Sequence, residues 1–200
     1  MLAFVIFVFA VAGMIKGTIG LGLPAVSMGL LSLVISPFQA ATLLIIPSMV
    51  TNFWQLFAEG RVMRLVQRFW PLLVGMIIGS VWSVFPTLGH GEFQSEALLG
   101  GMLAIYGLYG LFAKNMPNLA PYEKYLSPIM GYLGGALTVA TGVVVIPVVP
   151  YLQSLHLKRD DLVQSLGLAF TVSTLCLAVY LHLNPVEDTP IDYQLSLIAL

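Results

Sequence analysis

Long stretches without acidic or basic side chains dominate the chain and predict its main elements. They cover residues 1–15, 17–58, 69–91, 97–113, 125–157, 162–186 and 193–200. A membrane-spanning helix needs about 20 predominantly apolar residues, so windows 69–91, 97–113 and 162–186 each fit one helix. Windows 17–58 and 125–157 are too long for one helix and contain Gly or Pro breaks. The alternating pattern of a membrane barrel strand is absent, and the sequence therefore predicts an all-α, polytopic helical membrane protein.

Composition supports the membrane assignment and excludes several other classes. The 200 residues are 58% hydrophobic and only 8% charged, whereas a soluble domain carries roughly 25% charged residues. The net charge of −1 gives no reason to expect a nucleic-acid partner. The single cysteine excludes a disulfide framework and any cysteine-based metal site. The histidines lack metal-ligand spacing and no catalytic constellation stands out, so we expect no enzyme activity, metal or cofactor.

Charged residues in the short loops predict the orientation, because cytoplasmic loops carry an excess of Lys and Arg. Loop 59–68 holds three arginines and is expected inside, together with the lysine-containing segment 114–126. Loops 87–96 and 184–192 contain acidic residues without Lys or Arg and are expected outside. Segment 127–157 would then begin and end inside, which requires a hairpin of two short helices or a re-entrant loop. The expected location is a bacterial inner membrane that the chain crosses several times.

An internal repeat is the strongest organisational signal in the sequence. Segment 13–36 aligns with segment 131–154 at an offset of 118, which superposes the Gly-x3-Gly motif of each. Further along, the offset becomes about 122 and pairs Thr51 with Ser173 and Asn52 with Thr174. Each copy opens with a Gly-x3-Gly motif, a break, an apolar half-helix and then a full helix. The sequence thus predicts two repeats, each beginning with a broken-helix hairpin.

The two copies are expected to point in opposite directions through the bilayer. The full helix of the first copy, 38–58, ends at the arginine loop, whereas that of the second, 162–183, ends at an acidic loop. Inverted repeats with interrupted helices are typical of secondary transporters, whose substrate binds near the midplane at the breaks. The predicted organisation is a first membrane repeat over 1–113, a cytoplasmic linker over 114–126 and a second membrane repeat over 127–200, expected to be incomplete.

These motifs resemble the TauE/SafE sulfite exporter family, also called TSUP. The residues that carry the resemblance are Gly13-x3-Gly17-x2-Gly20-x-Gly22, Pro37-Phe-Gln-Ala40-Ala41, Gly60-Arg61-Val62, Gly131-x3-Gly135 and Gly142-Val-Val-Val-Ile-Pro147. The resemblance covers nearly the whole chain. It implies a membrane protein that moves sulfite, sulfonates or other small sulfur or carboxylate anions outward.

Residues at the helix breaks are the first candidates for a substrate site. Glycine at a break lets the backbone approach a ligand and exposes unpaired N–H groups, which the helix dipole makes attractive to anions. The break residues expected to line the cavity are Gly20, Gly22, Thr138, Thr141 and Gly142. Half-helices 23–35 and 143–152 would aim their N-termini at it. The alternative is close helix packing, favoured for Gly13, Gly17, Gly75, Gly79, Gly131 and Gly135.

Polar side chains within the apolar helices are the second group of candidates. Lys16 is the only charged residue in the first 58 positions, and it either neutralises an anion or extends to the cytoplasmic interface. Thr51, Asn52 and Thr174 either line the site or form hydrogen bonds between helices. For Gln55, as for Ser173, the bonding role is favoured.

The predicted function is a permease that exports a small anion by alternating access between the two repeats. Its partners would be that anion and the lipid bilayer, and the formation of a homo-oligomer is left open. The nucleotide-binding pattern GxxxxGK[ST] is absent from the sequence. The alternative is a membrane scaffold or assembly factor without transport. Helix breaks in 13–36 and 131–154 that meet at one depth would favour transport, whereas continuous helices would favour the scaffold.

Overall fold

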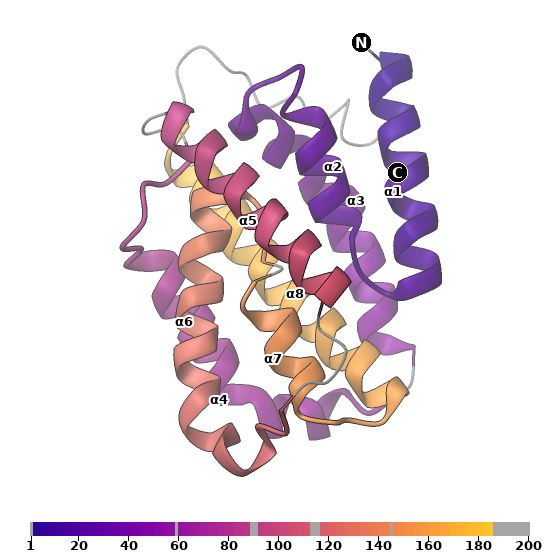
Figure 1. Ribbon diagram of the computed structural model, residues 1–200, viewed down its shortest axis with the longest axis vertical. Coiled ribbons are helices and arrows are strands. Elements are labelled where there is room, and N and C mark those ends of the chain that lie inside the picture. Colours follow the sequence, from indigo (N-terminus) through magenta and orange to yellow (C-terminus); the bar gives the residue numbers. More distant parts are fainter. Residues whose placement is uncertain (1, 59, 89–91, 113–116, 145, 186–200) are drawn as a thin grey trace.

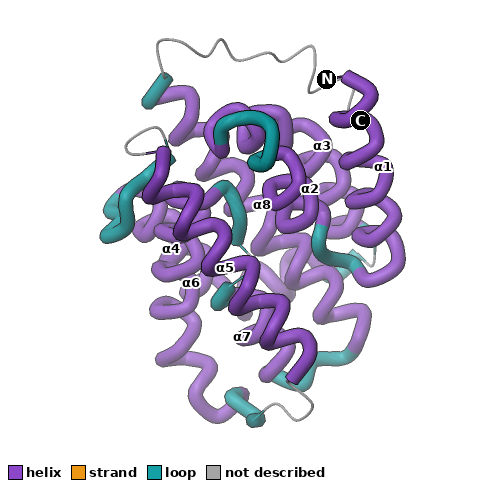
Figure 2. Tube along the Cα trace, turned by 45° about the horizontal axis from the view of Figure 1, so that its top comes forward, coloured by secondary structure: helices purple, strands orange, loops and turns teal. Residues whose placement is uncertain are grey.

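The protein is a bundle of helices in a computed structural model that describes residues 2–58, 60–88, 92–112, 117–144 and 146–185 (Figures 1 and 2). The helices are α1 (Leu2–Ile19), α2 (Leu23–Leu31), α3 (Pro37–Phe57), α4 (Val62–Val81), α5 (Glu92–Phe112), the 3-10 helix η1 (Ala120–Tyr122), α6 (Glu123–Thr141), α7 (Val148–Ser154) and α8 (Arg159–Leu183). No strand occurs within the described ranges. The prediction of an all-α protein is confirmed.

Several helices are long and apolar enough to cross a membrane. The described residues contain five such candidates: Leu2–Ile19, Pro37–Phe57, Val62–Val81, Gln94–Phe112 and Arg159–Leu183. This confirms the polytopic membrane class. The expected outer loop 184–192 lies mostly outside the described residues, as does the apolar run 193–200.

The first predicted break is present, between α1 and α2. Helix α1 continues through Lys16 to Ile19 and stops where Gly20 and Gly22 adopt φ values of 79° and 108°. Left-handed backbone of this kind ends a helix and strongly favours glycine. Pro24 then lies in the first turn of α2, where a missing N–H costs nothing. The expected half-helix 23–35 ends four residues early, at Leu31.

The second predicted break separates α6 from α7. Gly142 has φ 75° and terminates α6, and Pro147 caps the start of α7. The segment does form a hairpin, but α6 has 19 residues and is not a short helix. The expected half-helix 143–152 is wrong, because the helix begins only at Val148, after Pro147. Residues 123–126, which were expected in the linker, form the first turn of α6.

Helix α4 starts earlier than the uncharged window indicates. It begins at Val62, so Arg64 and Arg68 lie on the helix and not in a loop. Leu65 and Phe69 are buried one turn apart on the same face. The apolar face of α4 therefore includes the first two turns, which also carry Arg64 and Arg68. Arg68 donates two hydrogen bonds to Glu123, at 2.8 and 2.7 Å. Amphipathic arginine stems permit such an extension.

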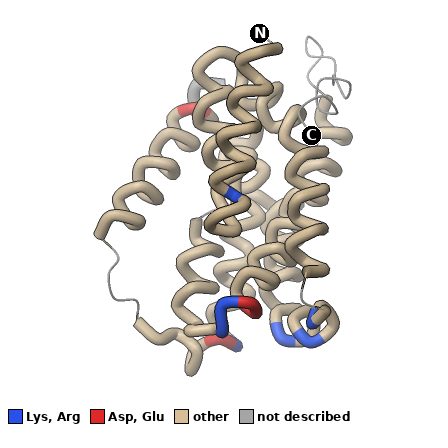
Figure 3. The backbone as a smooth tube through the Cα atoms, turned by 90° about the vertical axis from the view of Figure 1, so that its right-hand side faces the viewer, with Lys and Arg blue, Asp and Glu red and all other residues tan. Residues whose placement is uncertain are grey.

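Most basic residues gather at one end of the bundle, which we call the basic end (Figure 3). It carries Arg61, Arg64, Arg68, Lys124, Lys158 and Arg159. One ion pair there joins Arg61 to Asp161 at 2.9 Å. Figure 3 also shows a basic position on α1 away from this end, and the only basic residue of α1 is Lys16.

Helices α4 and α6 pack most closely, through glycines. A Cβ atom built on Gly135 would lie 2.0 Å from the carbonyl oxygen of Met76, and one on Gly79 would lie 2.0 Å from that of Tyr132. A Cβ atom on Gly75 would lie 2.4 Å from the carbonyl oxygen of Pro128, and one on Gly131 would lie 2.1 Å from that of Leu72. The packing role is confirmed for these four glycines. It is wrong for Gly13 and Gly17 in the described structure, where nothing lies within 4 Å of an added Cβ.

Helices α3 and α8 form the centre of the bundle, and they run antiparallel. Gly167 near the start of α8 lies against the backbone of Leu56 near the end of α3. Leu44 and Leu177, from the opposite ends of the same helices, line one small cavity. In contrast, α5 crosses the front of the bundle and α1 lies at its edge (Figure 1). The residues predicted for the site lie on α1, α3, α6 and α8 or at the helix breaks.

Candidate functional site: a buried lysine between broken helices

Lys16 turns into the bundle and does not extend to the interface. Its side chain is only 6% exposed. The ammonium nitrogen Nζ donates hydrogen bonds to Thr51 Oγ1, at 2.9 Å, and to Asn52 Oδ1. It also lies 5.9 Å from the centre of the Phe170 ring, within the range of a cation–π contact. Of the two roles predicted for this lysine, the structure therefore favours the interior one.

Asn52 connects the lysine to the second half of the chain. The amide is fully buried, and its Nδ2 donates to Thr174 Oγ1 at 3.2 Å. Thr174 in turn donates to the carbonyl oxygen of Phe170 at 2.8 Å. We call Lys16, Thr51, Asn52 and Thr174 the lysine cluster. Its members come from α1, α3 and α8, and all four were predicted from the sequence.

The charge of Lys16 is compensated only by neutral groups. Among the residues that the structure describes, the ion pairs are Arg61–Asp161 and Arg68–Glu123, and neither involves Lys16. A charged residue near the centre of a membrane helix costs about 2.5–3.5 kcal/mol even on the lenient insertion scale. Hydroxyl and amide oxygens offset only part of that cost. A bound anion would offset the rest, because it brings the missing opposite charge next to Nζ.

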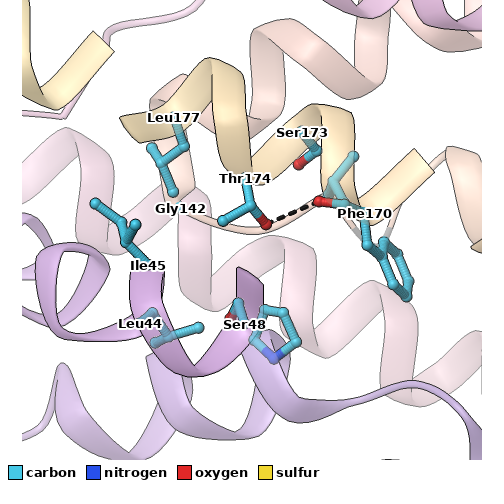
Figure 4. Close-up of a pocket in the computed structure, with 10 residues that line it drawn as sticks. Leu44, Ile45, Ser48, Gly142, Phe170, Ser173, Thr174 and Leu177 are labelled. Carbon is cyan, nitrogen blue, oxygen red and sulfur yellow. Dashed lines mark hydrogen bonds between the residues drawn. The ribbon is translucent and has the colours of Figure 1, made fainter. Parts of the chain in front are cut away.

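A small cavity of about 20 Å³ adjoins the cluster (Figure 4). Its lining residues are Pro24, Leu44, Ile45, Ser48, Gly142, Val144, Phe170, Ser173, Thr174 and Leu177. Ser48 is 2% exposed, and its hydroxyl has no hydrogen-bond partner. A cavity of this size has room for about one water molecule. It is therefore a small, mainly apolar cavity beside Thr174 with a few hydroxyl groups in its wall, and it is too small for an oxyanion without rearrangement.

The structure brings only some of the other predicted residues to this place. Gly142 lines the cavity, and Thr138 bonds Ser173 at 3.3 Å. Thr141 is buried and donates to the carbonyl oxygen of Leu137. Gly20 instead lies beside Gln55, and Gly22 lines a separate groove of about 640 Å³ between α1, α2 and α5.

The two breaks thus lie toward opposite ends of the bundle and do not meet at one depth. Gly20 lies beside Gln55 at the basic end of α3. Gly142 lies against Ala41, near the other end of that helix. The lysine cluster lies between these levels, because Thr51 and Asn52 lie between Ala41 and Gln55 on α3.

Contacts around the cluster repeat at one constant spacing. Lys16 bonds Thr51, and Thr138 bonds Ser173, each across 35 residues. Both members of the second pair follow their counterparts by 122 positions, the separation that also joins Asn52 to Thr174. Gly20 and Gly142 have the same spacing and nearly the same φ, 79° and 75°. These contacts fit an offset of 122 throughout and do not fit the offset of 118 predicted for the first segment.

Two polar residues near the cluster were missed by sequence reasoning. Ser48 precedes Asn52 by one helical turn, so the i, i+4 spacing could have placed both on one face. Gln164 is fully buried and donates to the carbonyl oxygen of Leu56 at 2.6 Å. Gln164 could not be recognised from the sequence, because it lies near the charged start of α8, where polar residues are expected to be solvated. The interhelical bonding predicted for Gln55 is confirmed, with donation to Gly20 and Val163.

An ionisable residue buried among membrane-spanning helices marks a candidate functional site in a membrane protein. The chain matches the family model of the sulfite exporter TauE/SafE over residues 5–200, and it belongs to that family. The family indicates a membrane transporter of the sulfite-exporter type. No curated protein and no solved structure matches the chain.

Proposed function

We propose that this protein exports a small oxyanion such as sulfite, with Lys16 as the centre of its binding site. The observation that carries the proposal is the burial of this ammonium group with only neutral partners. An arriving anion would take the place of the Asn52 and Thr51 oxygens at Nζ. The Nζ hydrogens and the second hydrogen of the Asn52 amide would donate to the oxygens of the anion, and the Thr51 and Thr174 hydroxyls would join them only by turning away from the carbonyl oxygens of Pro47 and Phe170.

The proposed transport cycle is alternating access between two inverted repeats. Three features support this arrangement: α3 and α8 run antiparallel, each follows a broken-helix hairpin, and Asn52 contacts the residue 122 positions later. A two-fold axis relating the copies would pass close to a contact between equivalent residues. The lysine cluster would then lie near the bilayer midplane, and the second repeat would open with α6 at Glu123 and not at residue 127.

The orientation and the driving force follow from charge. The basic end would face the cytoplasm of a bacterial inner membrane, because short cytoplasmic loops are enriched in Lys and Arg. Outward movement of an anion is favoured by a negative interior, by about 2.3 kcal/mol per charge for each 100 mV. Export could therefore proceed as a uniport without a second ion.

The two breaks do not meet at the one depth that we expected for transport, but neither segment is the continuous helix that we expected for the scaffold. A scaffold needs close helix packing only, which continuous helices with glycine faces would supply, as α4 and α6 do. The break at Gly20–Gly22 and the end of α6 at Gly142 instead interrupt the helical hydrogen bonds inside the bundle. Binding and conformational change near the site give those breaks a function, whereas packing does not require them.

Sulfite flux into proteoliposomes under an imposed potential tests this proposal, with a matched pair of threonines on α8. Thr174→Val is expected to reduce flux about tenfold, because it removes the hydroxyl that bonds Asn52 and lines the cavity. Thr171→Val is expected to leave flux unchanged. Thr171 is also buried and also bonds a carbonyl of its own helix, that of Gly167, but it does not line the cavity.

Sulfate, thiosulfate, a sulfonate and a carboxylate would be compared in the same assay to rank the cargo. If well-folded wild-type protein carried none of these anions, the transport proposal would fail and the scaffold would replace it. Equal losses in Thr174→Val and Thr171→Val would contradict the placement of the site.

A further inference from the structure

Two glutamines tie α3 to α8 between the lysine cluster and the basic end. Gln55 Nε2 donates to the carbonyl oxygen of Val163 at 2.8 Å. In the reverse direction, Gln164 Nε2 donates to the carbonyl oxygen of Leu56 at 2.6 Å. Each helix thus supplies an amide that bonds the backbone of the other. Both side chains are buried, at 7% and 0% exposure.

The same level of the bundle is closely packed. A Cβ atom on Gly167 would lie 2.9 Å from the backbone nitrogen of Leu56, so the two helices approach here nearly to backbone contact. Gln55 also donates to the carbonyl oxygen of Gly20 at 2.9 Å, which ties the first helix break to the same point. Among the described residues, these contacts bring α1, α3 and α8 together at this level.

We call the contacts of Gln55 with Val163 and of Gln164 with Leu56 the glutamine seal. Its hydrogen bonds are incomplete. The Oε1 atoms of both Gln55 and Gln164 are buried without a partner. A buried acceptor without a hydrogen-bond partner costs free energy. When the contact opens, a hydrogen bond to water would recover that free energy. The closed arrangement is therefore held by strong donor contacts and opposed by unpaired acceptors, as expected of a contact that must open and close.

In the part of the chain that the structure describes, the opposite end of α3 and α8 has no equivalent pair of glutamine contacts. The positions related to Gln55 and Gln164 by the spacing of 122 are Leu177 and Thr42. Leu177 lines the small cavity, and Thr42 donates to the carbonyl oxygen of Phe38 on its own helix. The cavity beside Thr174 thus lies on the outer side of the cluster, and the glutamine seal lies on the inner side.

We propose that Gln55 and Gln164 form the inner gate of the transport path, which closes the lysine cluster from the cytoplasm. The inference rests on the proposed transport function and names the residues that control access to its site. Gln55 follows Asn52 by about one turn on α3. A movement of α3 that accompanies anion binding at Asn52 would therefore also move the gate. Both glutamines act as positioning residues for the path and need not touch the anion.

Access to a cysteine beside the lysine tests the gate without requiring transport. The reporter is Thr51→Cys in a Cys176→Ser background, which removes the single native cysteine. A negatively charged methanethiosulfonate reagent is applied to the cytoplasmic face of inside-out membrane vesicles. Gln164→Leu is expected to raise the labelling rate at least tenfold, because it removes the bond to Leu56. Gln164→Asn, whose shorter amide cannot reach Leu56, is expected to raise it as well.

The matched control is Gln67→Leu, the same change at an exposed glutamine of α4 near the basic end, with no expected effect. Unchanged labelling in both folded Gln164 variants would overturn the gate. If labelling rose in the Gln164 variants but wild-type protein carried no anion flux, the gate would stand and the proposed transport function would fail. Suppose that wild-type protein carried sulfite, that Thr174→Val reduced the flux, and that the Gln164 variants left labelling constant. Only the gate would then be overturned.

Discussion

Replacement of Lys16 by methionine is expected to reduce sulfite flux at least a hundredfold while leaving the protein folded. The ammonium group is the only charge in the lysine cluster, and its interactions with an anion would be lost together. A loss of about 3 kcal/mol, typical of a charged hydrogen-bonding partner in a buried site, corresponds to roughly a hundredfold. The measurement is flux in proteoliposomes under an imposed potential.

Stability distinguishes a binding role of Lys16 from a structural one. Exchange of a buried charge for an apolar side chain of similar volume is often neutral or stabilising. The thermal midpoint of Lys16→Met in detergent is therefore expected to equal or exceed that of the wild type. A variant that lost flux only because it unfolded at lower temperature would show that Lys16 is structural. Lys124→Met, at an exposed lysine of the basic end, is the matched control for flux.

Gly135→Ala is expected to destabilise the fold by about 3 kcal/mol or more, the upper range for overpacking. The added Cβ would lie 2.0 Å from the carbonyl oxygen of Met76, and backbone atoms cannot rotate away as a side chain can. Helices α4 and α6 would have to separate along their contact. Unfolding titrations in mixed micelles measure the change.

Gly13→Ala is the matched control for this prediction. Gly13 lies in α1 at the position 122 residues before Gly135, but nothing lies within 4 Å of its added Cβ. Alanine is the better helix former by roughly 0.5–1 kcal/mol, so this variant is expected to be as stable as the wild type or more stable. Equal stabilities of Gly135→Ala and Gly13→Ala would contradict the close α4–α6 packing.

Much of the fold could be predicted because the bilayer imposes a simple rule on sequence. Apolar windows of sufficient length form helices, since an unpaired backbone group in lipid costs several kcal/mol. The breaks could be predicted for a local reason as well. Left-handed backbone at Gly20, Gly22 and Gly142 needs glycine, and proline after each break prevents the preceding helix from continuing.

The start of α4 could not be predicted from charge alone. The arginines at positions 64 and 68 indicate a loop in a hydropathy count, but long amphipathic stems allow them to lie on a helix at the interface. The repeat register of the first segment is ambiguous in the sequence for a different reason. An offset of 118 superposes both glycines of each Gly-x3-Gly motif, whereas an offset of 122 aligns Gly13 with Gly135 but Gly17 with Val139, so the glycine pattern alone favours 118. Only the contacts of Lys16, Thr138 and their partners favour 122 for this segment.

By itself the sequence determined that this protein is an all-helical membrane protein with two interrupted helices, and which polar side chains stand out within apolar spans. Those properties depend on local composition and on the cost of polar groups in lipid. The tertiary structure decided that Lys16 points inward to Asn52, that Asn52 meets Thr174, and that Gln55 and Gln164 join α3 to α8. These partners are separated by 36 to 122 residues, and their meeting depends on how whole helices pack, which no local pattern records.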